Sequence, residues 1–161
     1  MGPVGHTIVS VGIGGTMWAA TGASASVAAA SVTGVLIDVD HVLDYYNWYW
    51  KKDKGKLYVL FHGWEYSAVA LVLVLAVWYH PVLLAAVLGH IGHLIGDQIG
   101  NRPIHPLAYS VIYRISAGFD RPRLAGEVPE TYSEALNKIP LWPKIEPLVV
   151  RIASRLGITH R

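Results

Sequence analysis

Uncharged apolar segments alternate with short polar segments over the first hundred residues of the chain. Residues 7–37 contain no charged residue and are rich in Gly, Ala, Ser and Val. Gly22 divides this stretch into two apolar segments, 7–21 and 24–37. Small side chains such as Ala28 allow two helix backbones to approach closely in a bilayer. We therefore expect a helical hairpin, with a single long helix through the stretch as the alternative.

A second pair of apolar segments follows at residues 67–99. Residues 67–79 are rich in Val and Leu and carry no charge. His80 and Pro81 then form a turn, because proline ends or kinks a helix and disfavours helical geometry in the residue before it. A further apolar helix is expected over 82–99. The pattern predicts an all-α protein built on about four apolar helices.

The composition changes after residue 100. A short helix is expected over 107–117, and a linker rich in Gly, Pro and charged residues over 118–130. Residues 144–156 place basic residues opposite Ile, Leu and Val, which predicts an amphipathic helix. Such a helix lies on a membrane surface, docks on the bundle or dimerises, and the sequence leaves these alternatives open. We expect one helical domain over 1–117 and an amphipathic tail over 118–161.

The composition favours a membrane protein. Hydrophobic residues make up 53% of the 161 residues, charged residues only 15%, and the mean hydropathy is +0.38, values unusual for a soluble protein. An aromatic run at 45–50 precedes the lysines of 51–56, as is typical of a membrane–water interface, although a solvated aromatic loop is the alternative. Membrane lipids are therefore expected partners. The net charge of +2 gives no reason to expect nucleic acid.

The positions of the basic residues predict an orientation. All 13 Lys and Arg lie in two regions, four in 51–56 and nine in 102–161. If the apolar segments form four spans, both regions and the N-terminus share one side of the membrane. The other side holds only 21–24 and the turn at His80, which carry no Lys, Arg, Asp or Glu. The positive-inside tendency then predicts a multi-pass membrane protein with both termini in the cytoplasm.

One apolar helix carries three polar side chains at helical spacing. His90, His93 and Asp97 lie at i, i+3 and i+7, within about 60° of one another on a helix. Ionisable groups are costly to bury unless they are paired, and inside an apolar helix they indicate a functional site. A histidine bonded to a carbonyl beside a helix-end aspartate is the alternative. Three such residues on one face favour a set of metal ligands.

The predicted two-hairpin topology brings more His and Asp side chains to the same end of the bundle. His6 precedes the first helix, the polar stretch 38–44 follows the second, His62 and Glu65 precede the third, and His105 follows the fourth. The chain has no cysteine, so a metal would be held by His and carboxylate groups, which suit zinc, manganese or iron. The predicted metal ligands are His6, Asp38, Asp40, His41, His62, His90, His93, Asp97 and His105.

This inventory exceeds the three or four ligands of one ion, so two or more ions bridged by a carboxylate are plausible. Paired ions activate water and clamp the oxygens of a phosphoester under cleavage. Asp40 is the candidate bridge and Glu65 a ligand or general base, and these two are the predicted catalytic residues. Asp38 and Asp44 have a helix-end role as an alternative. Arg102 and Arg114 would bind a phosphate or a lipid headgroup, or else anchor the surface.

The ordered motifs resemble a known family. An N-terminal His6, the run Asp38-Val39-Asp40-His41, His62, and a His-x-x-His-x-x-x-Asp motif at 90–97 are similar in order to the membrane-bound, metal-dependent hydrolases often described as LexA-binding inner-membrane hydrolases. The family's Pro-Asp-x-Asp-His has Ile37 in place of its proline. Its Arg-Gly-x-Thr-His-Ser segment is replaced by Phe-His-Gly-Trp-Glu, which keeps one histidine. The resemblance implies a membrane-bound metal-dependent hydrolase of a distinct subgroup.

A second, weaker resemblance concerns ligand order alone. His6, Asp40, His62, the pair at 93–97 and His105 follow an order similar to that of zinc-dependent phospholipases C and related single-strand nucleases. It implies hydrolysis of a phosphoester, here a lipid-like substrate. The alternatives are a metal-binding or metal-transport membrane protein, a regulatory protein without turnover, and a haem-binding protein. A homo-oligomer is compatible with each of them.

Overall fold

The described part of the chain is all-α, as predicted. The computed structural model describes residues 2–101, 103–125, 144, 147, 148, 151 and 155. Among these residues the only strand-like feature is an isolated bridge between Lys56 and Asp120. The chain forms two compact units, Met1–Val128 and Pro129–Arg161. Arg102 and most of the amphipathic helix expected at 144–156 lie outside the described residues.

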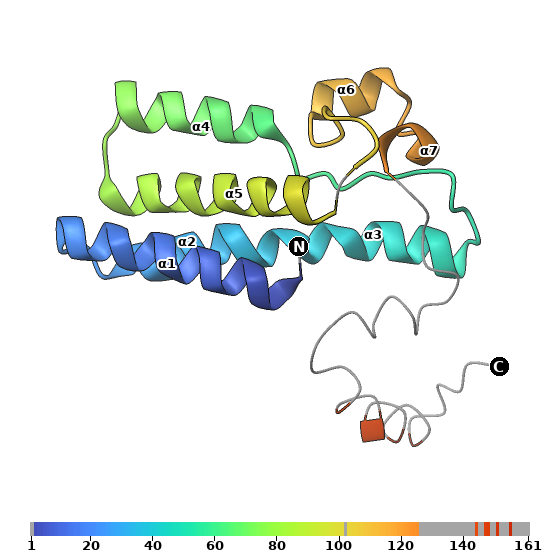
Figure 1. The fold of residues 1–161 in the computed structure, drawn as a ribbon, viewed down its shortest axis with the longest axis horizontal. Helices are drawn as coiled ribbons and strands as arrows, with labels where there is room; N and C mark the ends of the chain where they lie inside the picture. Colours follow the sequence, from blue (N-terminus) through green and yellow to red (C-terminus); the bar gives the residue numbers. More distant parts are fainter. Residues whose placement is uncertain are drawn as a thin grey trace. The chain divides into compact units, whose positions relative to one another are not determined.

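The first two helices form the hairpin that the sequence predicts. Helix α1 (Pro3–Thr21) begins with a proline in its first turn, and helix α2 (Ala25–Val35) runs back beside it (Figure 1). Gly22 ends α1 with φ of 74°, a left-handed conformation that glycine adopts at little cost. The alternative of one long helix through residues 7–37 is therefore wrong.

Helical structure continues beyond the end that the sequence predicts for the second segment. After α2 come the 3₁₀ turn η1 (Leu36–Asp40), helix α3 (His41–Tyr45) and the π-helical turn η2 (Tyr46–Trp50), which together with α2 form one run, Ala25–Trp50. The part of this run that is labelled α3 extends beyond the ends of α1 and α5 (Figure 1). No glycine or proline lies between Leu36 and Trp50. Asp40 and Asp44 are held by partners elsewhere in the fold, so their charges do not end the helix.

The second pair of apolar segments also forms two helices side by side. Helix α4 (Trp64–Ala76) and helix α5 (Pro81–Gly100) are joined by a short turn (Figure 1). His80 caps α5, because its Nδ1 accepts a hydrogen bond from the Val82 amide at 3.3 Å. The predicted helix over 107–117 is shorter in the structure, α6 (Val111–Ser116). Helix α7 (Arg121–Leu124) lies where we expected only a linker.

Helices α1, α2 and α5 pack closely because glycines lie at their contacts. A methyl group on Gly14 of α1 would lie 2.5 Å from the Val27 Cα of α2. A methyl group on Gly89 of α5 would lie 2.8 Å from the Ala30 Cα of α2. The Thr33 hydroxyl of α2 donates to the Ala86 carbonyl of α5 at 2.6 Å. This close packing fixes the ends of α2 and α5, where the polar cluster lies.

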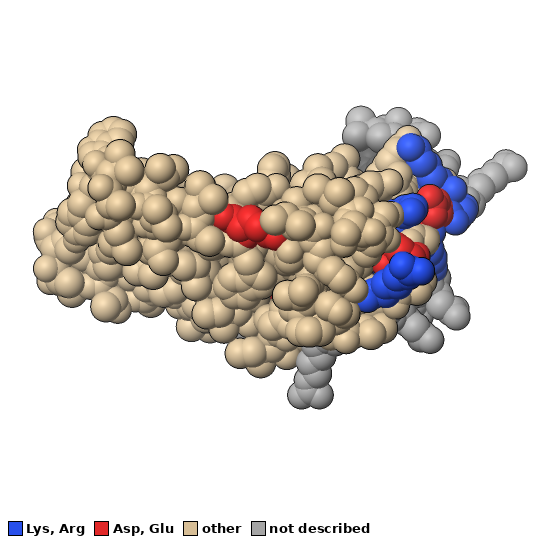
Figure 2. Space-filling model, turned by 90° about the horizontal axis from the view of Figure 1, so that it is seen from above, with Lys and Arg blue, Asp and Glu red and all other residues tan. Residues whose placement is uncertain are grey.

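Much of the helical surface is apolar and exposed. Two helical runs, Ala25–Trp50 and Pro81–Gly100, are long and apolar enough to cross a membrane, and only 28% and 33% of their apolar stretches are buried. Helix α4 is apolar but shorter. Figure 2 shows a face of the protein whose charged side chains gather toward one end, whereas the opposite end carries none.

Candidate metal centre

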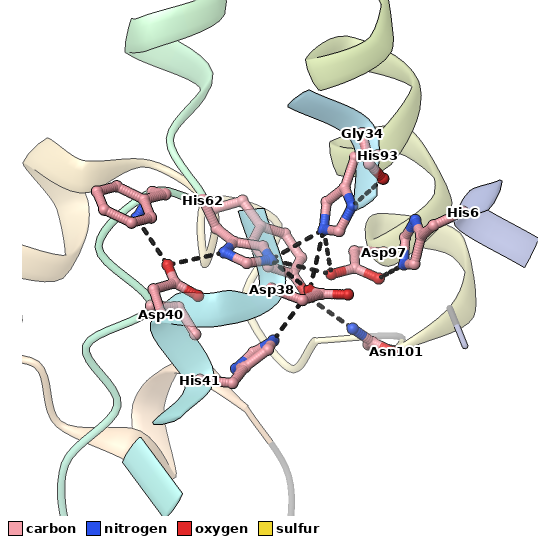
Figure 3. A network of polar contacts seen from close by, with 12 residues as sticks. His6, Gly34, Asp38, Asp40, His41, His62, His93, Asp97 and Asn101 are labelled. Atoms are coloured by element: carbon pink, nitrogen blue, oxygen red, sulfur yellow. Dashed lines mark hydrogen bonds and ion pairs between the residues drawn. The ribbon is translucent and has the colours of Figure 1, made fainter. Parts of the chain in front are cut away.

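Four side chains from three parts of the chain converge at one point (Figure 3). Asp38 comes from η1, His62 from the loop before α4, and His93 and Asp97 from α5. Nε2 of His62 lies 2.9 Å from Nε2 of His93. Oδ1 of Asp38 lies 3.2 Å from Nε2 of His62 and 3.4 Å from Nε2 of His93. Oδ2 of Asp97 lies 3.6 Å and 3.4 Å from the same two nitrogens.

The other ring nitrogens of the two histidines are already used. Nδ1 of His62 donates to Oδ2 of Asp40 at 3.0 Å, and Nδ1 of His93 donates to the Gly34 carbonyl at 2.9 Å. A neutral imidazole that donates through Nδ1 presents a lone pair at Nε2. If both rings are neutral, two lone pairs face each other at 2.9 Å. This arrangement requires a shared proton or a cation between them.

The spacing of the four atoms fits one small cation. Zinc binds nitrogen and oxygen ligands at about 2.0–2.1 Å in a tetrahedron, which places neighbouring ligand atoms about 3.3 Å apart. The distance between the two histidine nitrogens and the four histidine–aspartate distances run from 2.9 to 3.6 Å. These five distances are close to those of a tetrahedral site with two histidine and two aspartate ligands.

His6 and His41 extend the cluster on opposite sides. Nε2 of His6 donates to Oδ1 of Asp97 at 2.9 Å, and the His6 ring stacks on that of His93 with centroids 3.8 Å apart. Nε2 of His41 lies 3.4 Å from Oδ1 of Asp38. The side chains of Asp38 and His41 are 30% and 26% exposed, whereas those of His6 and His93 are fully buried. The cluster is therefore accessible from the side of Asp38 and His41.

The loop that carries His62 is held by two aspartates of the α2–η2 run. Asp40 accepts hydrogen bonds from the Phe61 amide at 2.7 Å and from His62. Asp44 accepts from the amides of Tyr58 at 2.7 Å and Val59 at 2.9 Å. Burial lowers the pKa of His62, but its hydrogen bonds with Asp38 and Asp40 outweigh burial and hold the pKa above its ordinary value. Asp40 thus orients His62 and fixes its tautomer.

A buried arginine supports the same loop from behind. Arg114 is fully buried, and its Nη1 donates to the carbonyls of His62 at 2.7 Å and Ala108 at 3.0 Å. Its Nε and Nη2 have no hydrogen-bond partner within the described residues, and burial lowers its pKa. Arg114, which the sequence left as a phosphate or lipid ligand or an anchor, therefore lies inside the fold and not on its surface.

Three predicted site residues have their polar atoms engaged elsewhere. His90 accepts from the Ser67 hydroxyl at Nδ1 and donates from Nε2 to the Phe61 carbonyl, at 2.6 and 3.0 Å. His105 stacks on Tyr113 with centroids 4.1 Å apart, and its Nδ1 accepts from a neighbouring amide. The carboxylate of Glu65 caps helix α6. In the described part of the chain two groups of residues could hold an ion, and neither includes any of these three. The groups are Asp38, His41, His62 and Asp97, and His6, Asp38 and His93.

Glu65 holds the start of α6. Its carboxylate accepts from the Ser110 hydroxyl at 2.5 Å and from the amides of Val111 at 2.9 Å and Ile112 at 3.2 Å. A carboxylate at a helix N-terminus satisfies amides that have no partner inside the helix. Its contacts give Glu65 a capping role.

Tyr109 and Asn101 are two polar residues near the cluster that the sequence analysis did not identify. The ring centroid of Tyr109 lies 6.0 Å from that of His62, and Nδ2 of Asn101 donates to the Tyr109 hydroxyl at 2.9 Å. Asn101 follows Asp97 by one helical turn, and this spacing was the one available signal. Tyr109 lies in an irregular segment, where no periodicity marks it.

Comparisons with known proteins do not assign the chain. No family model, no curated protein and no solved structure matches it.

Proposed function

We propose that the chain is a membrane-bound, metal-dependent hydrolase whose metal is held by Asp38, His62, His93 and Asp97. The observation that carries this proposal is the pair of imidazole Nε2 atoms facing each other at 2.9 Å between two carboxylates. Buried groups of this kind are costly unless something pairs with them. A divalent cation at this point would attract both Nε2 atoms and both carboxylates.

Zinc is the ion that the ligand set favours, with manganese and iron as alternatives. Two imidazoles and two carboxylates at near-tetrahedral spacing match its common coordination. The carboxylates of Asp38, Asp40 and Asp97 leave an excess of negative charge that Arg114 offsets only in part. A bound zinc ion would supply a water of lowered pKa as the nucleophile. Asp38, on the accessible side, is the ligand best placed to give way to that water.

A second ion would use Asp38 as its bridge. Asp38 is common to the two ligand groups of the cluster, one with His41, His62 and Asp97 and one with His6 and His93. Asp40, which we expected to be the bridge, uses Oδ2 to hold Phe61 and His62. We propose one ion in the four-residue site and treat a second as a measurable alternative.

The proposed location is the inner membrane, with four spans and the metal site near the cytoplasmic face. Soluble monomers seldom expose large continuous apolar surfaces. Here α4 exposes Val69, Val72 and Leu75 by more than half, and the next segment exposes Val77 and Trp78 further still. The basic residues at 51–56 and 102–161 favour the cytoplasm for the polar end. Helices α1 and α4 would complete the four spans.

The proposed substrate is a phosphoester at the membrane surface, and this rests on the family resemblances alone. The resemblance to LexA-binding inner-membrane hydrolases is likewise part of the proposal. Metal transport is less well supported, because α4 carries no charged residue after Glu65 that would continue a path across the bilayer. Carboxylates around the histidines disfavour haem. A regulatory protein with a metal site remains the main competitor.

The test compares two histidines on one helix. Detergent-purified wild type is stripped of metal, reloaded with zinc and analysed for metal content beside His93→Ala and His90→Ala. We expect about one zinc per chain in wild type and His90→Ala, and almost none in His93→Ala. Asp40→Ala should weaken zinc binding about 10–100-fold, because His62 loses the partner that orients it.

Two results would overturn the proposal. Wild type that binds no zinc, manganese or iron after reloading would remove the metal site. A metal-loaded wild type that cleaves none of a panel of phosphomonoesters, phosphodiesters and phospholipids would leave a metal-binding protein without the proposed activity. An absorption spectrum of the purified protein tests the haem alternative directly.

A further inference from the structure

A tyrosine hydroxyl lies beside the cluster and has no role in holding the metal. Tyr109 is 8% exposed, and its ring is tilted against that of the ligand His62 at 6.0 Å between centroids. Asn101 ends α5 one turn after Asp97, and its amide donates to the Tyr109 hydroxyl at 2.9 Å. Figure 3 shows Asn101 on the side of the cluster where Asp38 and His41 lie.

The hydrogen bond from Asn101 decides which way the tyrosine proton points. Because the amide nitrogen donates, the phenol oxygen accepts, and the hydroxyl hydrogen is left to donate to something else. Within residues 2–101 and 103–125 this hydroxyl donates no hydrogen bond to another group. A hydroxyl at this depth normally has a partner for its proton.

The hydroxyl is near the carboxylates of Asp97 and Asp38, whose charges act on it, but it donates a hydrogen bond to neither of them. A phenol with an ordinary pKa of about 10 is protonated over the whole neutral range, so Tyr109 is a hydrogen-bond donor there. A ligand oxygen that is negatively charged and bound at the cluster is the acceptor it would best complement.

We propose that Tyr109, oriented by Asn101, donates a hydrogen bond to an oxygen of a phosphoryl-type oxyanion bound at the metal centre. The pair then forms an oxyanion position next to the metal, on the side left accessible by Asp38 and His41. Arg114, behind the His62 loop, adds positive potential without touching the ligand. This inference rests on the proposed function and names its ligand class.

The test measures anion binding and needs no substrate. Zinc-loaded protein in detergent is titrated with inorganic phosphate by calorimetry, for wild type, Tyr109→Phe and Tyr113→Phe. Tyr113 stacks on His105 outside the cluster and supplies the matched control. We expect Tyr109→Phe to keep its zinc and to bind phosphate about tenfold more weakly, because it loses a hydrogen bond to a charged group. Tyr113→Phe should bind phosphate like wild type.

A double-variant cycle tests the role of Asn101. If Asn101 acts through Tyr109, Asn101→Ala weakens phosphate binding in the wild-type background and has no further effect in Tyr109→Phe. A purely structural role would instead lower stability equally in both backgrounds, which thermal unfolding reports.

The outcomes separate this inference from the proposed function. Wild type that binds no zinc would overturn both the proposed metal site and the oxyanion position. Zinc-loaded wild type that binds no phosphate, or Tyr109→Phe that binds phosphate as tightly as wild type, would overturn the oxyanion position and leave the metal site intact.

Discussion

Asp44 influences the cluster indirectly, through the loop that carries His62. It is fully buried and accepts two backbone hydrogen bonds, from Tyr58 and Val59. Val59 has a φ of 35°, a conformation that is unfavourable for a β-branched residue. The His62 amide in turn donates to the Val59 carbonyl at 3.0 Å. Asp44 therefore holds a strained turn that places His62, a proposed metal ligand.

Replacing this carboxylate tests that role. We expect Asp44→Asn to lower the free energy of unfolding by about 2 kcal/mol, because an amide cannot accept both backbone hydrogen bonds and its NH₂ group meets a donor. Zinc affinity should fall with it, since the His62 loop loosens. Asp53→Asn is the control, because Asp53 is exposed and bonds only its own turn at Gly55, so its effect should stay within about 0.5 kcal/mol. Thermal unfolding reports the stability and zinc titration the affinity. An Asp44→Asn variant with the stability and zinc affinity of wild type would contradict the proposed role of Asp44.

For single residues, the sequence predicted that His and Asp side chains lie together at one end of the bundle. It did not predict which partner each side chain has. Helical spacing placed His93 and Asp97 on one face correctly. It also placed His90 there, although that ring bonds to Ser67 on the neighbouring helix, a contact that no spacing encodes. Asp40 holds a histidine because of the path of the loop that carries His62, and the sequence does not predict that path. Tyr109 has neither charge nor periodicity to mark it.

Among the elements, the contact between α2 and α5 controls the position of the cluster. Gly89 lies against Ala30, and the Gly34 carbonyl of α2 accepts a hydrogen bond from His93 on α5. The two helices can approach this closely only where side chains are absent. A change of an ångström in this contact would move Asp38 relative to His93.

Gly89→Ala tests the contact. The new methyl group would meet backbone atoms of Ala30, which cannot move away as a flexible side chain can, so we expect a loss of about 1–3 kcal/mol in stability together with weaker zinc binding. Gly12→Ala is the matched control, because Gly12 lies in α1 with open space around it, and alanine there should stabilise the helix by up to about 1 kcal/mol. Equal effects of the two substitutions on thermal unfolding and zinc content would argue against a tight contact.

The helix boundaries were predictable where glycine or proline marks them. Gly22 and Pro81 lie at the ends that the sequence predicted. The continuation of α2 through Trp50 was not predictable in the same way, because the three aspartates at 38, 40 and 44 suggested the end of an apolar helix. Asp40 and Asp44 accept hydrogen bonds from a loop that lies 14 to 22 residues further along the chain, and only the folded structure reveals those partners.

On the scale of the whole molecule, the distribution of charge and exposed apolar surface favours insertion in a membrane. The turn between α1 and α2 and the turn at His80 carry no Lys, Arg, Asp or Glu, whereas the segment after η2 carries four lysines. The proposed topology places these turns and this segment on opposite sides of the bilayer.

The absence of cysteine makes this topology simple to test. We expect Asp53→Cys to react with a membrane-impermeant maleimide only after cells are opened, and Ser24→Cys to react in intact cells whose outer barrier is permeabilised. Both positions are in exposed or partly exposed turns, so neither should disturb the fold. Labelling of both from the same side would contradict the hairpin arrangement, and recovery of the protein in the soluble fraction would contradict membrane insertion.

The cluster joins parts of the chain that are far apart in sequence. Contacts within it span 24 residues between Asp38 and His62, 31 between His62 and His93, and 91 between His6 and Asp97. An ion at 1,000 times its dissociation constant would add about 4 kcal/mol to stability, a large part of the roughly 5–15 kcal/mol of a typical domain. Metal starvation would then act as a quality-control signal: chains that lose their ion would open more often and reach proteases, so that the amount of protein in the cell follows the supply of metal.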